Sequence, residues 1–214
     1  SNLTDRRLVK VTGRIPVETL NDCGAESGAA LAEGIQEASI FAERDPYRSA
    51  THNKGIMNGV DAVLVAFGQD WRAVEAGAHA YAARSGRYTA LAQWRVQDDV
   101  LVGTMEIPMA VGVVGGVSGV HPNVQLARRI ASVKSAADLA SLVAAVGLAQ
   151  NLGAIRALSA EGIQAGHMRL HARNVAVQAG AQGTEIPEIA NAIATQGTVN
   201  VTAAQEALRA MHAA

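Results

Sequence analysis

The stretch Arg48-Ser49-Ala50-Thr51-His52-Asn53-Lys54-Gly55-Ile56-Met57-Asn58-Gly59 stands immediately before the apolar run Val60 to Phe67. Apolar residues repeat at helical spacing through this run, so the sequence predicts a helix that begins near Gly55 and buries that face. Asn53 is a candidate N-cap for it. Lys54 would then lie at the positive end of the helix dipole, where an anion is favoured and a second cation is not. Such a lysine has a carboxylate partner or an anionic ligand, unless the stretch is only a polar loop that caps a buried helix.

Three further motifs follow this stretch in a fixed order: Gly68-Gln69-Asp70, Gly103-Thr104-Met105-Glu106-Ile107-Pro108 and Gly166-His167-Met168. Together with Ala50 to Gly59 they resemble the bacterial (class II) 3-hydroxy-3-methylglutaryl-coenzyme A (HMG-CoA) reductases. The resemblance runs over essentially the whole chain but covers only the C-terminal half of that family's subunit. It implies the four-electron reduction of HMG-CoA to mevalonate and coenzyme A, or the reverse, with NADH or NADPH and no metal. It also implies a homodimer or higher homo-oligomer with active sites at the subunit boundary.

Composition narrows the class of protein. Of the 214 residues 49% are hydrophobic and only 3% aromatic, and the net charge of −1 argues against a nucleic-acid or membrane-surface binder. Cys23 is the only cysteine, so no intrachain disulfide forms. We find no signal peptide and no uninterrupted apolar stretch of the roughly 20 residues that a membrane span needs, and we expect a cytoplasmic protein. Because a strand pattern begins within ten residues of Ser1, we expect the chain to be a piece of a larger protein.

The pattern along the chain predicts an α+β fold. Leu8 to Val17 reads as a strand, and Tyr88 to Val96 with Val100 to Ile107 reads as a hairpin. Gly112 to Gly119 lacks G-x-G-x-x-G spacing and a P-loop lysine, and is read as a tight backbone turn. The predicted helices span 26–41, 55–67, 71–83, 122–131, 135–150, 155–158, 167–179 and 187–194, with a last helix capped by Thr202.

Two details of these helices are specific enough to be tested. Helix 26–41 would turn Leu31, Ile35, Ala38 and Phe41 inward, and Asp45-Pro46 would end it. The helix that opens with the Ser135 capping box would break or end at Asn151-Leu152-Gly153.

No strand pattern follows residue 162, which places a domain boundary there. We expect residues 1–161 to be the C-terminal part of a large HMG-CoA-binding domain, with a long buried central helix, surrounding helices and a small antiparallel sheet. Residues 162–214 would form a small all-helical flap domain that carries His167 and begins at a hinge between Gly162 and Gly166.

The implied reaction needs a cation facing the thioester oxygen, which becomes negative when hydride arrives. The resemblance gives that role to Lys54, with Asp70 holding Lys54 charged and oriented, although Asp70 alone would read as a solvated residue or a helix cap. His167 suits protonation of the departing thiolate, because an imidazolium is a competent acid near neutral pH.

The substrate carboxylate needs donors, and Arg48, Thr51 and Asn58 suit it. Arg169 and Arg173 are weaker candidates for the coenzyme A phosphates. His167 and His171 have the i, i+4 spacing of a metal site, but Met168 stands where a zinc protease has Glu, and no third ligand is evident. No cofactor-binding residues are expected in this chain, because the family's glutamate acid and dinucleotide domain come from sequence that would precede Ser1.

Two other functions stay open. Lys54 could be the nucleophile of a Schiff-base lyase or aldolase, which requires an apolar pocket. Alternatively, the Ala- and Gly-rich helices could form a non-catalytic assembly domain. Lys54 and Asp70 are sixteen residues apart, mostly within one predicted helix, which separates their backbones by roughly 20 Å. We therefore expect Asp70 of one subunit to meet Lys54 of the other in a two-fold homodimer.

Overall fold

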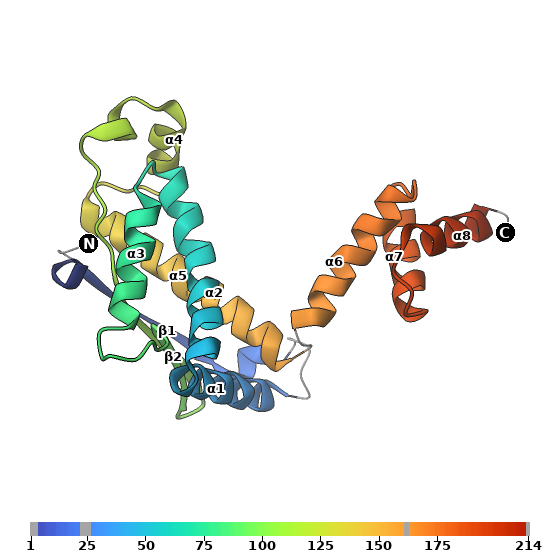
Figure 1. Ribbon diagram of the computed structural model, residues 1–214, viewed down its shortest axis with the longest axis horizontal. Helices are drawn as coiled ribbons and strands as arrows, with labels where there is room; N and C mark the ends of the chain where they lie inside the picture. Colours follow the sequence, from blue (N-terminus) through green and yellow to red (C-terminus); the bar gives the residue numbers. More distant parts are fainter. Residues whose placement is uncertain (1–3, 22–26, 161–162, 213–214) are drawn as a thin grey trace. The chain divides into compact units, whose positions relative to one another are not determined.

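The computed structural model describes residues 4–21, 27–160 and 163–212. The chain divides into two units, Ser1–Ala160 (unit 1) and Glu161–Ala214 (unit 2). In the described residues the strands all belong to unit 1, together with five of the α-helices, and unit 2 is helical (Figure 1). The predicted α+β fold is confirmed.

The sheet of unit 1 is antiparallel in the order β1-β3-β2. Asp98 and Asp99 turn the β2–β3 hairpin with φ of 47° and 60°, the left-handed values that a two-residue turn needs. In β3, Leu101, Met105 and Ile107 point inward and are fully buried, whereas Thr104 and Glu106, which alternate with them, are half-buried. The predicted strand and hairpin are confirmed, and the strands are β1 (Leu8–Pro16), β2 (Ala92–Gln97) and β3 (Val100–Pro108).

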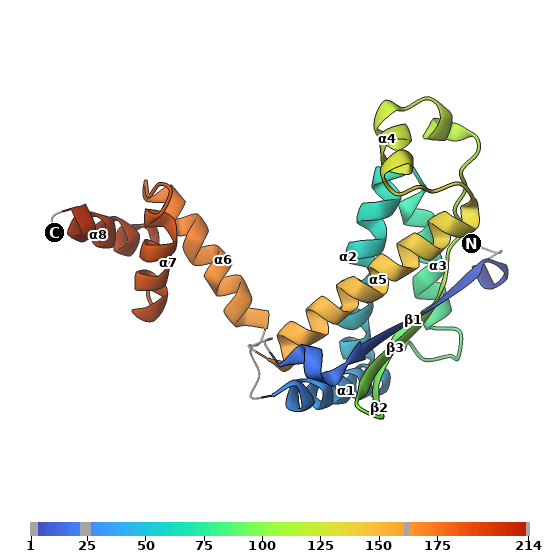
Figure 2. The same cartoon turned by 180° about the vertical axis from the view of Figure 1, so that it is seen from behind.

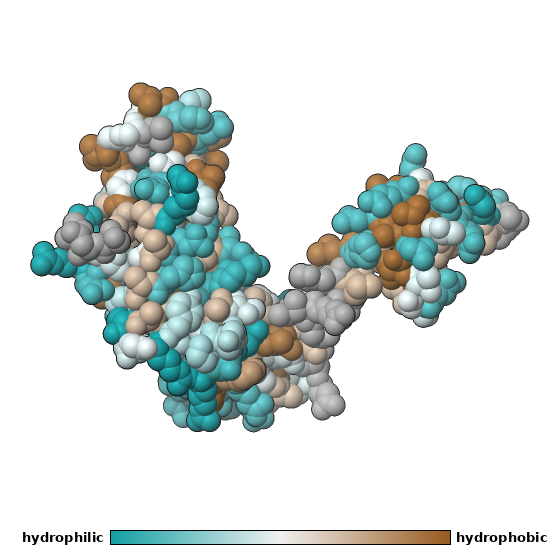
Figure 3. Space-filling view, viewed as in Figure 1, coloured by the Kyte–Doolittle hydropathy of each residue, from teal (hydrophilic) through white to brown (hydrophobic). Residues whose placement is uncertain are grey.

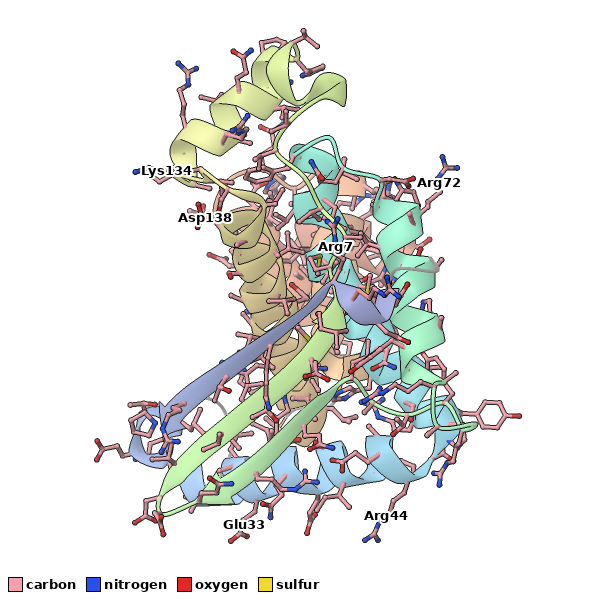
Figure 4. All side chains as sticks on the ribbon, turned by 90° about the vertical axis from the view of Figure 1, so that its left-hand side faces the viewer. Arg7, Glu33, Arg44, Arg72, Lys134 and Asp138 are labelled. Carbon is pink, nitrogen blue, oxygen red and sulfur yellow. The ribbon has the colours of Figure 1, made fainter. Side chains whose placement is uncertain are left out.

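The helices of unit 1 form layers on the sheet. Helices α1 and α5 pack against it, α2 packs against both of these helices, and α3 packs against α2 and β3. Figure 2 shows α5 running alongside β1 and β3, and Figure 4 shows Glu33 and Arg44 projecting from α1 away from the sheet. The helices are α1 (Gly28–Arg44), α2 (Pro46–Ala66), α3 (Trp71–Ala82), α4 (Pro122–Ile130) and α5 (Ala136–Ser159), with 3₁₀ turns η1 (Thr4–Arg6), η2 (Val17–Leu20) and η3 (Gly116–Gly119).

Helix α1 has the predicted inward stripe except at its end. Leu31 and Ile35 are fully buried, but Phe41 is 57% exposed, so its predicted burial is wrong. At 100° per residue Phe41 lies well to the side of the stripe, and Ala42 takes the inward place. Asp45 ends α1 as predicted.

Helix α5 opens with the predicted capping box: the Ser135 hydroxyl accepts from Asp138 N at 3.1 Å, and Ser135 N donates to the Asp138 carboxylate at 2.9 Å. The predicted break at Asn151 is wrong, because α5 continues to Ser159. Asn151 is buried, and its side chain accepts from Trp94 Nε1 at 2.8 Å and donates to the His52 carbonyl at 3.4 Å. Its polar groups are satisfied outside the helix, so they do not compete with the helix backbone.

By length and composition α5 is apolar enough to cross a membrane, although the sequence has no uninterrupted apolar stretch of that length. Here it is the core helix of unit 1, with Leu139, Val143 and Ile155 fully buried. A helix in the core of a folded domain can be as long and as apolar as a helix that crosses a membrane.

Unit 2 contains α6 (Ile163–Gln178), α7 (Glu185–Thr195) and α8 (Val201–His212). Thr202 is not the cap of α8, since it lies inside the helix and the side chain of Asn200 accepts from Ala203 N at 2.8 Å. The core of this unit is made of small and branched side chains: Ala172, Val175, Ala176, Ala181, Ile189, Ala190, Ile193 and Ala204.

Candidate active site

Helix α2 carries the polar stretch, and it begins at Pro46, well before the predicted start. The Asp45 carboxylate accepts from Arg48 N at 2.7 Å, so Asp45 is the N-cap and Pro46 fills the first helical position, where a missing N–H is harmless. The predictions that Asn53 caps the helix and that Lys54 lies at its positive end are therefore wrong. Lys54 stands more than two turns inside α2, where the dipole contributes little.

This helical geometry brings four predicted site residues onto one face. Arg48, Thr51, Lys54 and Asn58 follow one another at spacings of three, three and four, which keeps them along one side of α2. Thr51, Lys54 and Asn58 are exposed and Arg48 is half-buried. Burial lowers the pKa of the Arg48 guanidinium, and its Nε has no hydrogen-bond partner among the described residues. The face thus offers two cations, a hydroxyl and an amide to one anionic ligand.

Asp70 lies beyond the other end of α2. It is exposed and caps α3, with its carboxylate accepting from Ala73 N at 3.1 Å. Helix α2 runs unbroken past Gly59 to Ala66, which alone separates Lys54 from the helix end by about 18 Å. Among the described residues no ion pair joins Lys54 to Asp70 within the chain.

Gln69, the middle residue of the Gly68-Gln69-Asp70 motif, fixes the turn before Asp70. Its side-chain amide donates to the Gly112 carbonyl and accepts from Gly112 N, both at 2.9 Å. The tight turn predicted after Gly112 is confirmed by left-handed φ values at Gly115 and Gly116, 81° and 55°. The Gly-Gln-Asp motif is therefore tied to the glycine-rich segment, a contact that no local pattern announces.

The buried side of α2 is tied to the segment that leads into β2. Asn53 is fully buried, where it donates to the Thr89 carbonyl and accepts from Leu91 N, each at 2.9 Å. His52 is also buried, and neither ring nitrogen has a hydrogen-bond partner among the described residues. Burial, and then the charge of Arg48, lower the pKa of His52 to about 4, while contact with the Ala92 backbone partly opposes this shift. His52 is therefore neutral near pH 7.

In unit 2, His167 lies on α6, but its side chain and that of Arg169 are outside the described residues. His171 and Arg173 are described and exposed. Among the described residues no three His, Cys, Asp or Glu side chains form a metal site. A cleft of about 440 Å³ over the outer face of the sheet lies apart from the α2 face and is lined by other residues, including Lys10, Arg84 and Glu106.

The model of the family described as hydroxymethylglutaryl-coenzyme A reductase matches residues 1–172. The chain belongs to this family. It is 47% identical over 209 residues to the 3-hydroxy-3-methylglutaryl-coenzyme A reductase of Archaeoglobus fulgidus, an alignment that covers 97% of the chain and 46% of the relative. A probable reductase of Borreliella burgdorferi is 41% identical over 152 residues, or 71% of the chain and 35% of the relative.

Solved structures of the reductase from Streptococcus pneumoniae are also similar. One matches with a TM-score of 0.73 and 43% identity, covering 99% of this chain and 50% of that chain. A class II structure from the same organism, bound to NADPH in open conformations, matches with a TM-score of 0.69 and 44% identity, over 96% of this chain and 50% of that one. The chain thus spans about half the length of the relatives it matches, and the resemblance to the class II reductases is confirmed.

Proposed function

We propose that this chain is the C-terminal half of a class II HMG-CoA reductase subunit, which reduces HMG-CoA to mevalonate and coenzyme A, or runs the reverse reaction. The observation that carries the proposal is the single face of α2 that presents Arg48, Thr51, Lys54 and Asn58. HMG-CoA has a carboxylate and a thioester a few bonds apart, and a helix face with two cations separated by about 9 Å suits both groups.

In the reaction, Arg48, Thr51 and Asn58 hold the substrate carboxylate through charge-assisted and amide hydrogen bonds. The Lys54 ammonium faces the thioester oxygen and stabilises the negative charge that develops there. When the carbon–sulfur bond breaks, His167 donates a proton to the departing thiolate and releases coenzyme A. Residues 1–161 would form the substrate-binding part and residues 162–214 the flap that brings His167 to the thiolate.

Two molecules of the nicotinamide cofactor, NADH or NADPH, would supply the two hydrides, one hydride each. The described sheet is antiparallel and contains no parallel βαβ unit of the kind that binds dinucleotides. We therefore assign the cofactor site to sequence outside this chain, and the NADPH in the S. pneumoniae relative supports the use of such a cofactor. The glutamate acid of the family is likewise assigned to sequence outside this chain.

We assign Asp70 to the Lys54 of the partner subunit in a two-fold dimer. The unbroken helix α2 supports this, because it keeps the two groups of one chain far apart. Large apolar side chains are exposed near the glycine-rich segment that Gln69 holds, and brown surface marks this end of unit 1 in Figure 3. Such a patch is typical of a protein–protein interface. The exposed residues are Val114, Val120, Leu126 and Ile130.

The Schiff-base alternative is less well supported, because Lys54 is exposed, whereas a nucleophilic lysine needs an apolar pocket. We place the working enzyme in the cytoplasm.

Lys54→Ala tests the proposal in the complete dimeric enzyme. We expect kcat for HMG-CoA reduction to fall by about 10² to 10³, because one group that stabilises the oxyanion is lost. Isothermal titration should show weaker HMG-CoA binding, and the free energy of unfolding should stay within about 0.5 kcal/mol of the parent. Lys134→Ala, at another exposed lysine, is the control and should leave kcat unchanged. Equal turnover in the Lys54 and Lys134 variants would remove Lys54 from the reaction, and a non-catalytic assembly role would then gain support.

A further inference from the structure

The glycine-rich segment, residues 112–119, is held by side chains from two other elements. At its start, the Gln69 amide donates to the Gly112 carbonyl and accepts from Gly112 N, both at 2.9 Å. The Arg128 guanidinium on α4 donates to the neighbouring Val113 carbonyl at 3.2 Å. The start of the segment is therefore tied both to the α2–α3 turn and to α4.

The chemistry of Gln69 suits this contact. A side-chain amide carries a donor and an acceptor side by side, and these match the carbonyl and the N–H of Gly112. Nε2 of Gln69 also donates to the Phe67 carbonyl at 3.1 Å, at the end of α2. A methionine in this place would lose these bonds, and a glutamate would set a carboxylate against the Gly112 carbonyl. The contact therefore depends on the type of residue and not only on its size.

Asp70 is one peptide bond away from this contact. Its carboxylate accepts from Ala73 N at 3.1 Å and so caps α3. Trp71 N donates to the Gln69 carbonyl at 3.0 Å, which closes the backbone around Asp70 into a tight turn. Because Gln69 is held through its side chain and its backbone, a shift of Gly112 is passed to the capping residue.

We propose that Gln69 is a positioning residue that couples the placement of residues 112–119 to the placement of Asp70. The segment presents Val114, which is 92% exposed, within the apolar patch proposed to contact the partner subunit. Docking of that patch then sets Asp70, through Gln69, against the Lys54 of the partner subunit. The effect on turnover rests on the function proposed above, but the coupling between the segment and the cap of α3 does not.

Hydrogen exchange of the complete enzyme, resolved to peptides by mass spectrometry, tests the coupling. Arg128→Met removes the donor to the Val113 carbonyl, so residues 112–116 should exchange about tenfold faster, and residues 70–74 should exchange faster with them. In a Gln69→Met background the connection is cut, so Arg128→Met should cause no further change at residues 70–74.

Arg129→Met is the matched control for this experiment. Arg129 is exposed on α4, and its side chain has no hydrogen bond to the segment in the described part of the chain, so its loss should leave exchange at residues 70–74 as in the parent. The proposal is overturned if Arg128→Met changes residues 70–74 equally with and without Gln69, or if it changes residues 112–116 alone.

Gln69→Glu in the complete enzyme connects the coupling to turnover. We expect kcat to fall about ten- to a hundredfold, because Asp70 is displaced. The KM for HMG-CoA and the midpoint of urea unfolding should stay near those of the parent, whereas a residue that only closed a turn would change the midpoint and spare kcat. Gln97→Glu makes the same charge change at an exposed glutamine of β2 and should leave kcat unchanged. If exchange shows the coupling but kcat of Gln69→Glu equals that of the parent, the coupling stands and the role proposed for Asp70 fails.

Discussion

The two sides of α2 carry similar polar residues, but one side is exposed and the other is buried against the rest of unit 1. On the exposed side, Thr51, Lys54 and Asn58 have no hydrogen bond or ion pair to another element in the described part of the chain. On the buried side, Asn53 bonds to the segment that leads into β2, and His52 contacts the Ala92 backbone. Asn53 and Asn58 are five residues apart and chemically identical, yet one is 0% exposed and the other is at the surface. Residue type therefore does not distinguish the buried structural side chains from those proposed to bind the ligand, whereas the position around the helix does.

This difference predicts that changes on the buried side affect stability, while changes on the exposed side affect ligand binding. Buried polar groups are costly to leave unpaired, and exposed ones return to water.

The largest effect should come from His52 at acid pH. The pKa of His52 is about 4 in the folded chain, below the ordinary value of 6.5, so its contribution to stability is present above pH 6.5 and is lost as the pH falls towards 4. A shift of this size corresponds to about 3 kcal/mol. Urea unfolding of the parent at pH 7 and pH 4.5 should show much of this loss, and His52→Leu should lack it.

The raised pKa of Asp61 makes the free energy of unfolding increase, not decrease, as the pH falls over the same range. The quantity to measure is therefore the difference in unfolding free energy between His52→Leu and the parent at each pH. His171→Gln, at an exposed histidine of unit 2, is the control for removing an imidazole. If the parent and His52→Leu lose stability equally on acidification, the buried side of α2 does not hold a neutral histidine.

The next largest effect on stability should come from one of two matched asparagines of α2, Asn53 and Asn58. Asn53→Ala leaves the Thr89 carbonyl and the Leu91 amide without their partner in a buried place, and should lower the free energy of unfolding by about 2 to 3 kcal/mol. Asn58→Ala should change it by less than about 0.5 kcal/mol but weaken HMG-CoA binding in the complete enzyme. Urea denaturation and titration calorimetry separate the two, and similar stability losses in both variants would erase the distinction between the sides.

The sequence alone predicted much of this fold, because its signals were local. The β2–β3 hairpin, the Ser135 capping box and the end of α1 at Asp45 each depend on a few neighbouring residues. The start of α2 was missed because the apolar periodicity begins only at Ile56, whereas Asp45 and Pro46 act ten residues earlier.

The remaining errors concern contacts between distant parts of the chain. Asn53 bonds to residues 36 and 38 positions away, and Asn151 accepts from Trp94 across 57 positions. An asparagine with such partners reads as a cap or a breaker when only its neighbours are considered. The face shared by Arg48, Thr51, Lys54 and Asn58 could have been predicted, because it needs only a correct helix start. The partner proposed for Asp70 belongs to a second copy of the chain, so no pattern within one chain identifies it.

The smallest effects should come from two glycines of α2, and they should have opposite signs. A Cβ at Gly59 would lie 2.8 Å from Gln150 Cβ and 3.1 Å from the Val146 carbonyl, so α5 would have to move. Such overpacking costs about 1 to 3 kcal/mol, and the better helix propensity of alanine returns about 1 kcal/mol, so Gly59→Ala should destabilise unit 1 by about 1 kcal/mol.

A Cβ at Gly55 would meet only Ala154 Cβ at 3.6 Å, an ordinary contact. Gly55→Ala should therefore stabilise unit 1 by about 0.5 to 1 kcal/mol, because the propensity gain is unopposed. Thermal unfolding of the parent and the two variants measures both changes in stability, and their signs should be opposite. If both alanines stabilise the protein, α2 and α5 are not packed as closely as described, and the line between the buried and exposed sides of α2 lies elsewhere.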